Sequence, residues 1–201
     1  MSWEVSALRA TAHPLRLRML SLLTGAQLSA AEVARELGIT QANASYHLRL
    51  LAAAGLLEVA AERRVRGGLA KVYRHPWADD SPWTSAPEAE PDASSAGFVR
   101  AIAEELVRRY AYAAPRRPQS ATDAEVWVRP EVWEEVLSAV IQASSRLHAH
   151  AEPPRARGTV HVNMSAALFE LTDEPAEPRT RPASTGASRI QSPSRRRNGT
   201  R

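Results

Sequence analysis

Residues 41–54 carry amide, phenol and guanidinium side chains at the spacing of one helical face. Gln41 and Asn43 stand near the N-terminal end of this predicted helix, and their amide groups have the geometry that pairs with the edge of adenine. Arg49 suits a phosphate group, and Tyr46 suits either a base or a phosphate. The other face is apolar at helical spacing, with Ala44, Leu48 and Leu51. The pattern predicts a helix that buries one face and offers hydrogen-bonding groups on the other.

Caps and a glycine turn position this helix. Ser29 is a good N-cap, and Glu32 three residues later completes a capping box, which predicts a helix over residues 30–37. Gly38 follows directly, where a helix end favours left-handed backbone, and Thr40 caps the next helix. Two short helices joined by a tight glycine turn are typical of a helix-turn-helix. Two further helices are predicted before them, over residues 2–12 and 15–24.

A predicted hairpin comes next, with strands over residues 56–60 and 69–74. Arg63, Arg64 and Arg66 are expected at its tip, where a pair of glycines turns the chain. Guanidinium groups on such a loop can lie along phosphates or enter a minor groove. The alternative is a solvated arginine-rich hairpin. The predicted hairpin comes directly after a helix with exposed amide groups, and this order favours contact with nucleic acid.

The sequence resembles the ArsR/SmtB winged-helix repressors. The segments that carry the resemblance are LRATAHPLRLRMLSLL, SAAEVARELGITQANASYHLRLLAAAGLLEV and RRVRGGLAKVYRH, within about residues 7–75. The most specific part runs from Leu37 to Leu56. The resemblance implies a homodimer that lays the helix at 41–54 of each subunit into the major groove of a palindromic operator in double-stranded DNA.

The resemblance also implies which residues contact DNA. They are Thr40, Gln41, Asn43, Ser45, Tyr46, His47 and Arg49 on the helix, with Arg63, Arg64 and Arg66 on the hairpin. Within this set Thr40, Ser45 and Arg49 suit phosphates. For His47, packing or positioning of a phosphate contact is as good an interpretation as base reading, because the family often keeps a histidine here beside the buried face.

No metal, cofactor or catalytic chemistry is predicted. The chain has no cysteine, which excludes thiolate metal sites and cysteine nucleophiles. His148 and His150 are two residues apart, so on a helix they point to different faces. The sequence contains no phosphate-cradling glycine loop, nucleophile elbow or metalloprotease helix. We therefore expect a protein that is not an enzyme, with neither metal nor cofactor.

Charge and composition divide the chain into four segments. Residues 1–77 have ten Arg/Lys and five Asp/Glu, and residues 78–172 have nine and fourteen. A basic end followed by an acidic body favours a polyanion contact at one end, with a chance imbalance as the alternative. Within these limits, residues 78–95 are predicted to be a linker, 96–172 a second module and 173–201 a disordered basic tail. The tail is expected to be solvated, or else to touch phosphate without specificity.

The second module is predicted to be a small α/β unit for dimerisation or effector binding. Helices are expected over residues 97–113 and 130–149, and strands over 123–129 and 158–163. Ion pairs are expected from Glu104 to Arg108 and from Glu105 to Arg109. Its aromatic side chains are expected in a core, or lining a pocket for a small-molecule effector: Trp127, Trp133 and Phe169.

The fold class predicted is mainly α with a β-wing (α+β), a winged helix-turn-helix followed by that module. No apolar run reaches the length of a membrane helix, and residues 1–12 lack a signal-peptide pattern, so a cytoplasmic protein is expected. The predicted function is a dimeric, DNA-binding transcriptional repressor released by a non-thiol effector. The alternative is a winged-helix module that binds another protein instead of specific DNA.

Overall fold

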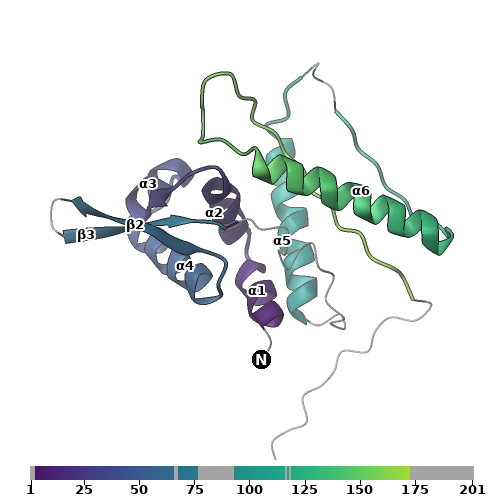
Figure 1. Ribbon diagram of the computed structural model, residues 1–201, viewed down its shortest axis with the longest axis horizontal. Helices are drawn as coiled ribbons and strands as arrows, with labels where there is room; N and C mark the ends of the chain where they lie inside the picture. The colour runs from purple at the N-terminus through teal and green to yellow at the C-terminus, as the bar shows by residue number, and fades with distance from the viewer. Residues whose placement is uncertain (1–2, 66–67, 77–92, 116, 118, 173–201) are drawn as a thin grey trace, which may run out of the picture.

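The computed structural model describes residues 3–65, 68–76, 93–115, 117 and 119–172. Its helices are α1 (Trp3–Thr11), α2 (Pro14–Thr24), α3 (Ala30–Leu37), α4 (Gln41–Ala53), α5 (Ala93–Tyr110) and α6 (Pro130–Ala149). Its strands are β1 (Leu28–Ser29), β2 (Glu58–Val65) and β3 (Gly68–Arg74). This is an α+β winged helix-turn-helix with added helices (Figure 1). Most of the predicted linker and the predicted tail lie outside the described residues.

Local sequence signals set the bounds of α3 as predicted, whereas α2 begins one residue earlier than predicted and α5 begins and ends before the predicted residues 97–113. The Ser29 hydroxyl accepts from the Glu32 amide, and the Glu32 carboxylate accepts from the Ser29 amide at 2.7 Å, which completes the capping box of α3. Gly38 ends α3 with φ of 66°, a left-handed conformation that a Cβ would strain. Before α2, His13 is the N-cap, and its Nδ1 accepts from the Leu15 amide at 3.1 Å.

The three strands form an antiparallel sheet in the order β1-β3-β2. The sequence did not predict β1, which is two residues long and pairs Leu28 with Tyr73. The predicted strands of the hairpin were too short, because β2 pairs with β3 from Glu58 opposite Arg74 to Val65 opposite Gly68. Arg63 and Arg64 consequently lie on a strand and not in the loop, because the main-chain pairing continues to Val65.

One hydrophobic core lies among α1 to α4 and the sheet. Its largest fully buried apolar side chains are Met19, Leu23, Val33, Leu48, Leu51 and Val72. The helix after the wing, α5, packs against α1 and α2. A Cβ at Gly97 would lie 3.0 Å from the Cβ of Ala12, so these helices approach closely. Ala101 and Glu105 are the α5 residues buried by this packing, within the described part of the chain.

The predicted α/β pairing of the second module is wrong. Residues 123–129 and 158–163 form no strand in the structure, which describes both segments. Alternating side chains favour an extended backbone, but a strand also needs a hydrogen-bonding neighbour, and the described residues supply none. Trp127 and Phe169 are 93% and 61% exposed, so the described residues form no core around them.

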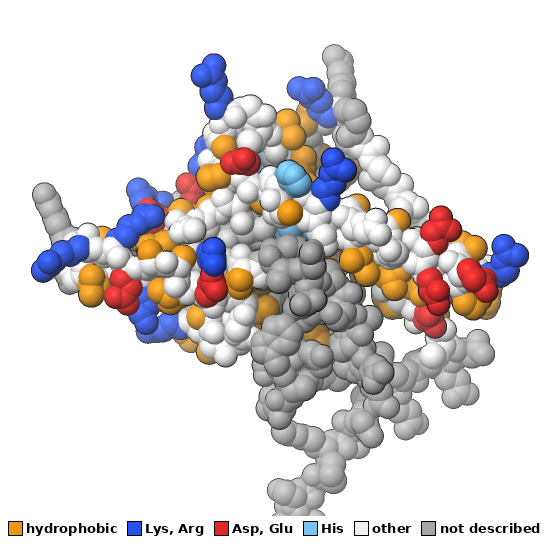
Figure 2. All heavy atoms as spheres, in the orientation of Figure 1, with side chains coloured by type: hydrophobic (Ala, Val, Ile, Leu, Met, Phe, Trp, Pro, Cys, Tyr) orange, Lys and Arg blue, Asp and Glu red, His pale blue; other side chains and the backbone are white. Residues whose placement is uncertain are grey.

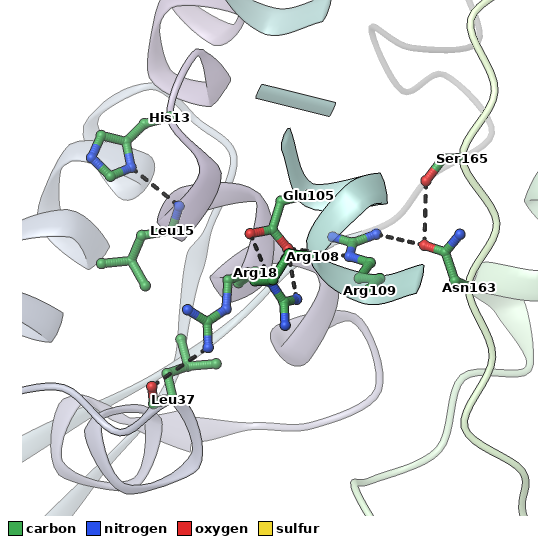
Figure 3. A network of polar contacts seen from close by, with 9 residues as sticks. All are labelled: His13, Leu15, Arg18, Leu37, Glu105, Arg108, Arg109, Asn163 and Ser165. Atoms are coloured by element: carbon green, nitrogen blue, oxygen red, sulfur yellow. Dashed lines mark hydrogen bonds and ion pairs between the residues drawn. The ribbon is translucent and has the colours of Figure 1, made fainter. Parts of the chain in front are cut away.

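Polar contacts attach this extended chain to the rest of the molecule (Figure 3). The buried Glu105 carboxylate accepts from Arg108 at 2.7 Å and from Arg109 at 3.2 Å, and Arg109 also donates to Asn163 Oδ1 at 3.0 Å. Arg108 therefore pairs with Glu105, three residues away, and not with Glu104 as predicted. Arg108 pairs with Glu105 because a buried carboxylate is unfavourable unless a positive charge or hydrogen-bond donor contacts it.

Candidate nucleic-acid interface

Helix α4 presents one buried face and one exposed face. Ala44, Leu48 and Leu51 are fully buried against the core, as their spacing predicts. The predicted contact residues that α4 exposes to solvent are Gln41, Asn43, Tyr46 and Arg49, while Ser45 is half-buried. The core thus fixes the rotation of α4, and this rotation turns amide, phenol and guanidinium groups outward.

The turn before α4 holds its first residues in place. Thr40 is exposed, and its Oγ1 accepts from the Asn43 amide at 3.2 Å, so the hydroxyl caps the helix and keeps its own proton to donate. Arg18 of α2 donates to the Leu37 carbonyl at 3.5 Å (Figure 3). The first contact caps the start of α4, and the second ties the end of α3 to α2.

His47 lies on the buried side of α4. Its side chain is 8% exposed, and its ring centroid is 5.0 Å from that of His13 and 5.1 Å from that of Tyr46. The pKa of His47 is lowered, mainly by burial and further by His13 and Arg16. The imidazole is therefore neutral at pH 7. The sequence left packing, phosphate positioning and base reading open for His47. Its buried position beside Tyr46 favours packing.

The wing places its arginines differently from one another. Arg63 Nη1 lies 3.2 Å from Oε1 of Glu32, the residue that caps α3. Arg64 is the next residue of β2, so its side chain points to the opposite face of the strand. Arg66 lies outside the described residues. The Glu32 contact was missed from the sequence because it joins residues 31 apart and needs the longer strand.

Positive charge gathers at the wing end of the molecule. Figure 2 shows Lys and Arg side chains over the wing and the helices beside it, and acidic side chains at the far end of α6. Lys71, which the prediction did not include, is exposed on β3 opposite Glu62. Lys71 could have been found from the sequence, because it lies on the predicted strand that follows the arginine-rich tip of the hairpin.

A family model described as a helix-turn-helix domain matches residues 11–60. The match covers 50 of the 201 residues. This domain spans α2, β1, α3, α4 and the start of β2, and domains of this kind are typical of DNA-binding regulators. The chain has no match among curated proteins. Over the residues that the structure describes, no helix is long and apolar enough to cross a membrane, and no cluster of His, Asp and Glu is suited to hold a metal ion.

Proposed function

We propose that this protein is a sequence-specific, duplex-DNA-binding transcriptional regulator, a dimeric repressor of the ArsR type. The observation that carries the proposal is the orientation of α4. A tight glycine turn presents this helix, the core buries its apolar face, and its polar face is open to solvent beside an arginine-bearing wing. A helix so presented fits the major groove.

In this proposal each group of residues has its own role. Gln41 and Asn43, at the first turn of α4, read base edges, because their amides can donate and accept at once. Thr40 and Arg49 bind phosphates and set the register of the helix. Ser45 and Tyr46 support these contacts, and His47 holds Tyr46 from below. Among the wing arginines, Arg64 and Arg66 reach the flanking backbone, and Arg63 joins them when it leaves Glu32.

Two further parts of the proposal concern regulation. A dimer reads a palindrome with one α4 in each half-site, so specificity follows from protein symmetry. An effector releases the repressor by favouring a second state, and the absence of cysteine directs the search to ligands other than thiol-bound metals. The protein acts in the cytoplasm, and the proposal assigns it no reaction.

The test is selection from a random duplex library with the purified full chain, followed by titration of the selected site against salt. A palindromic motif bound with a steep salt dependence supports the proposal, because phosphate contacts release counterions. No enriched motif, with weak binding lost on removal of residues 173–201, would overturn it. The winged helix would then be a protein-interaction module.

A further inference from the structure

Among the residues that the structure describes, two side-chain polar atoms are buried without a hydrogen-bond partner, and both lie in one cluster. They are Nε of Arg16 on α2 and Nδ1 of His47 on α4. The two side chains are close, because the pKa of His47 is lowered first by burial and then by the charges of His13 and Arg16. Almost all buried polar groups in folded proteins have a partner. Two such atoms in one place therefore indicate a site that a further group completes.

Arg16 is a half-buried cation without an acidic partner. Its Nη2 donates to the Arg9 carbonyl at 3.2 Å, and this end of the guanidinium lies at the surface. Over the described part of the chain, Arg16 forms no ion pair with a carboxylate. The pKa of Arg16 is lowered, mainly by burial, and Tyr46 offsets part of this shift. A charge that has lost water without gaining an opposite charge is unfavourable, so an anion that reaches it is bound strongly.

His13 supplies a second donor beside Arg16. Its Nδ1 accepts from the Leu15 amide at 3.1 Å (Figure 3), so in the neutral ring the proton is on Nε2. The ring is exposed, and its centroid lies 5.0 Å from that of His47. The main-chain amides of Arg16 and Leu17 already donate to the His13 carbonyl. An anion here would therefore be held by side chains and not by the free amides of a helix start.

Tyr46 joins this cluster to the polar face of α4. Its side chain is 53% exposed, and its ring stands edge-on to His47 at 5.1 Å. It is also close enough to Arg16 to act on the charge of the guanidinium. A duplex that lies against the polar face of α4 thus passes the cluster, and the anion that a duplex offers is a backbone phosphate. The planar guanidinium is the side chain best matched to phosphate oxygens.

We propose that Arg16 and His13 form a phosphate-binding site at the start of α2, which holds one backbone phosphate of the duplex bound by α4. The phosphate lies at the surface end of the Arg16 guanidinium and accepts from Nε2 of His13. Tyr46 flanks it, and the neutral His47 lies beneath. The inference rests on the proposed function, and it adds a contact from a second helix that sets how α4 lies in the groove.

The first test compares DNA affinity with stability in Arg16→Met, which keeps the length of the side chain and removes its charge. We expect the dissociation constants for the selected operator and for random duplex to rise about tenfold, and the salt slope to fall by about one. The melting temperature should stay the same or rise, because the change removes a half-buried charge that has no carboxylate partner. Unchanged affinity would overturn the site. A loss of affinity with a melting temperature several degrees lower would make Arg16 a structural residue instead.

Two further variants accompany Arg16→Met. Arg100→Met is the matched control, since it removes the same charge from an exposed position on α5, and its salt slope should equal that of the parent. His13→Asn removes the Nε2 donor but keeps a good N-cap for α2. It should raise both dissociation constants about threefold, as expected for the loss of one hydrogen bond. Parent-like affinity in His13→Asn would remove His13 from the site.

Neutral backbone positions locate the phosphate. In a series of operator duplexes, each carries one methylphosphonate, which has no charge. At one position the parent should lose about tenfold in affinity while Arg16→Met loses almost nothing more, and at the other positions the two chains should lose equally. If no position is coupled to Arg16, the proposed contact does not exist. Stabilisation of the parent but not of Arg16→Met by inorganic phosphate, without a coupled position, would make this a site for a free anion.

The same measurements separate this inference from the proposed function. If library selection yields no motif but Arg16→Met still weakens the binding of random duplex, the proposed function fails and the phosphate site stands. If an operator is found and Arg16→Met binds it like the parent, the phosphate site fails and the proposed function stands. A parent chain that binds neither operator nor random duplex would overturn both.

Discussion

Arg155, in the segment that follows α6, donates to both carboxylate oxygens of Glu36 on α3, at 3.1 and 2.9 Å. The two residues are 119 positions apart in the sequence. The contact connects the segment after α6 to the helix that precedes the glycine turn.

This pair should add little stability. The Arg155 side chain is 76% exposed, and exposed ion pairs contribute about 0–1 kcal/mol because water and salt screen them. In a double-mutant cycle with Arg155→Ala and Glu36→Gln, we expect a coupling free energy below about 1 kcal/mol that falls with added salt. Urea unfolding measures it. A larger, salt-independent coupling would mean that the contact is shielded from water.

Gly38 should be sensitive to the type of residue and not to its size. Nothing lies within 4 Å of a Cβ at this position, so the cost of replacement comes from its φ of 66°. Gly38→Ala should lower the free energy of unfolding by about 1 kcal/mol. Gly38→Asn is the control and should cost less, because Asn tolerates left-handed backbone. Equal losses in both variants would exclude backbone strain as the cause.

The phosphate contacts should be visible in the salt dependence of DNA binding. Arg49→Ala and Arg64→Ala should each weaken binding to all sequences and reduce the salt slope by about one. Arg63→Ala should have a smaller effect, because its guanidinium already pairs with Glu32. The measurement is a fluorescence titration at several salt concentrations with the selected operator. A salt slope that stays the same in Arg49→Ala and Arg64→Ala would remove both from the interface.

Acid should destabilise the protein through His75. Its Nδ1 donates to the Leu56 carbonyl at 2.7 Å, and its pKa is lowered, mainly by burial, with the Leu56 contact raising it in part and His148 lowering it further. The unfolded chain thus takes up a proton near pH 6.5 while the folded chain does not. The unfolding free energy should fall as pH drops below about 6.5, by up to about 1.4 kcal/mol per pH unit for this group.

The control for that pH dependence is His75→Asn, which should show a flatter profile between about pH 6.5 and 5. Part of the slope should remain, because the pKa of His47 is lowered as well. Thermal unfolding across this range measures both profiles. A variant as sensitive to acid as the parent would assign the dependence to other groups.

Removal of residues 173–201 should leave operator selectivity intact. This segment carries seven Arg and three Asp/Glu, so it adds positive charge, which attracts any duplex whatever its sequence. We expect equal losses of affinity for specific and random duplexes, measured by competition. A change in their ratio would give the segment a part in recognition.

Much of the helix-turn-helix was predictable because its signals are local. Ser29 and Glu32 are three residues apart and act within one turn, and Gly38 and Thr40 do the same at the next boundary. Helix α3 accordingly has the predicted bounds, and α4 ends one residue before the predicted end. The exposed position of Gln41, Asn43 and Arg49 followed from the apolar stripe behind them.

By itself the sequence determined the helices, the turn and the exposed face of α4, because caps and periodicity act over a few residues. Only the tertiary structure decided the rest. The burial of His47 against His13, the pairing of Arg63 with Glu32 and the unpaired state of residues 123–129 each depend on chain distant in sequence. Alternation alone predicts an extended backbone, but a strand forms only where another strand can share its hydrogen bonds.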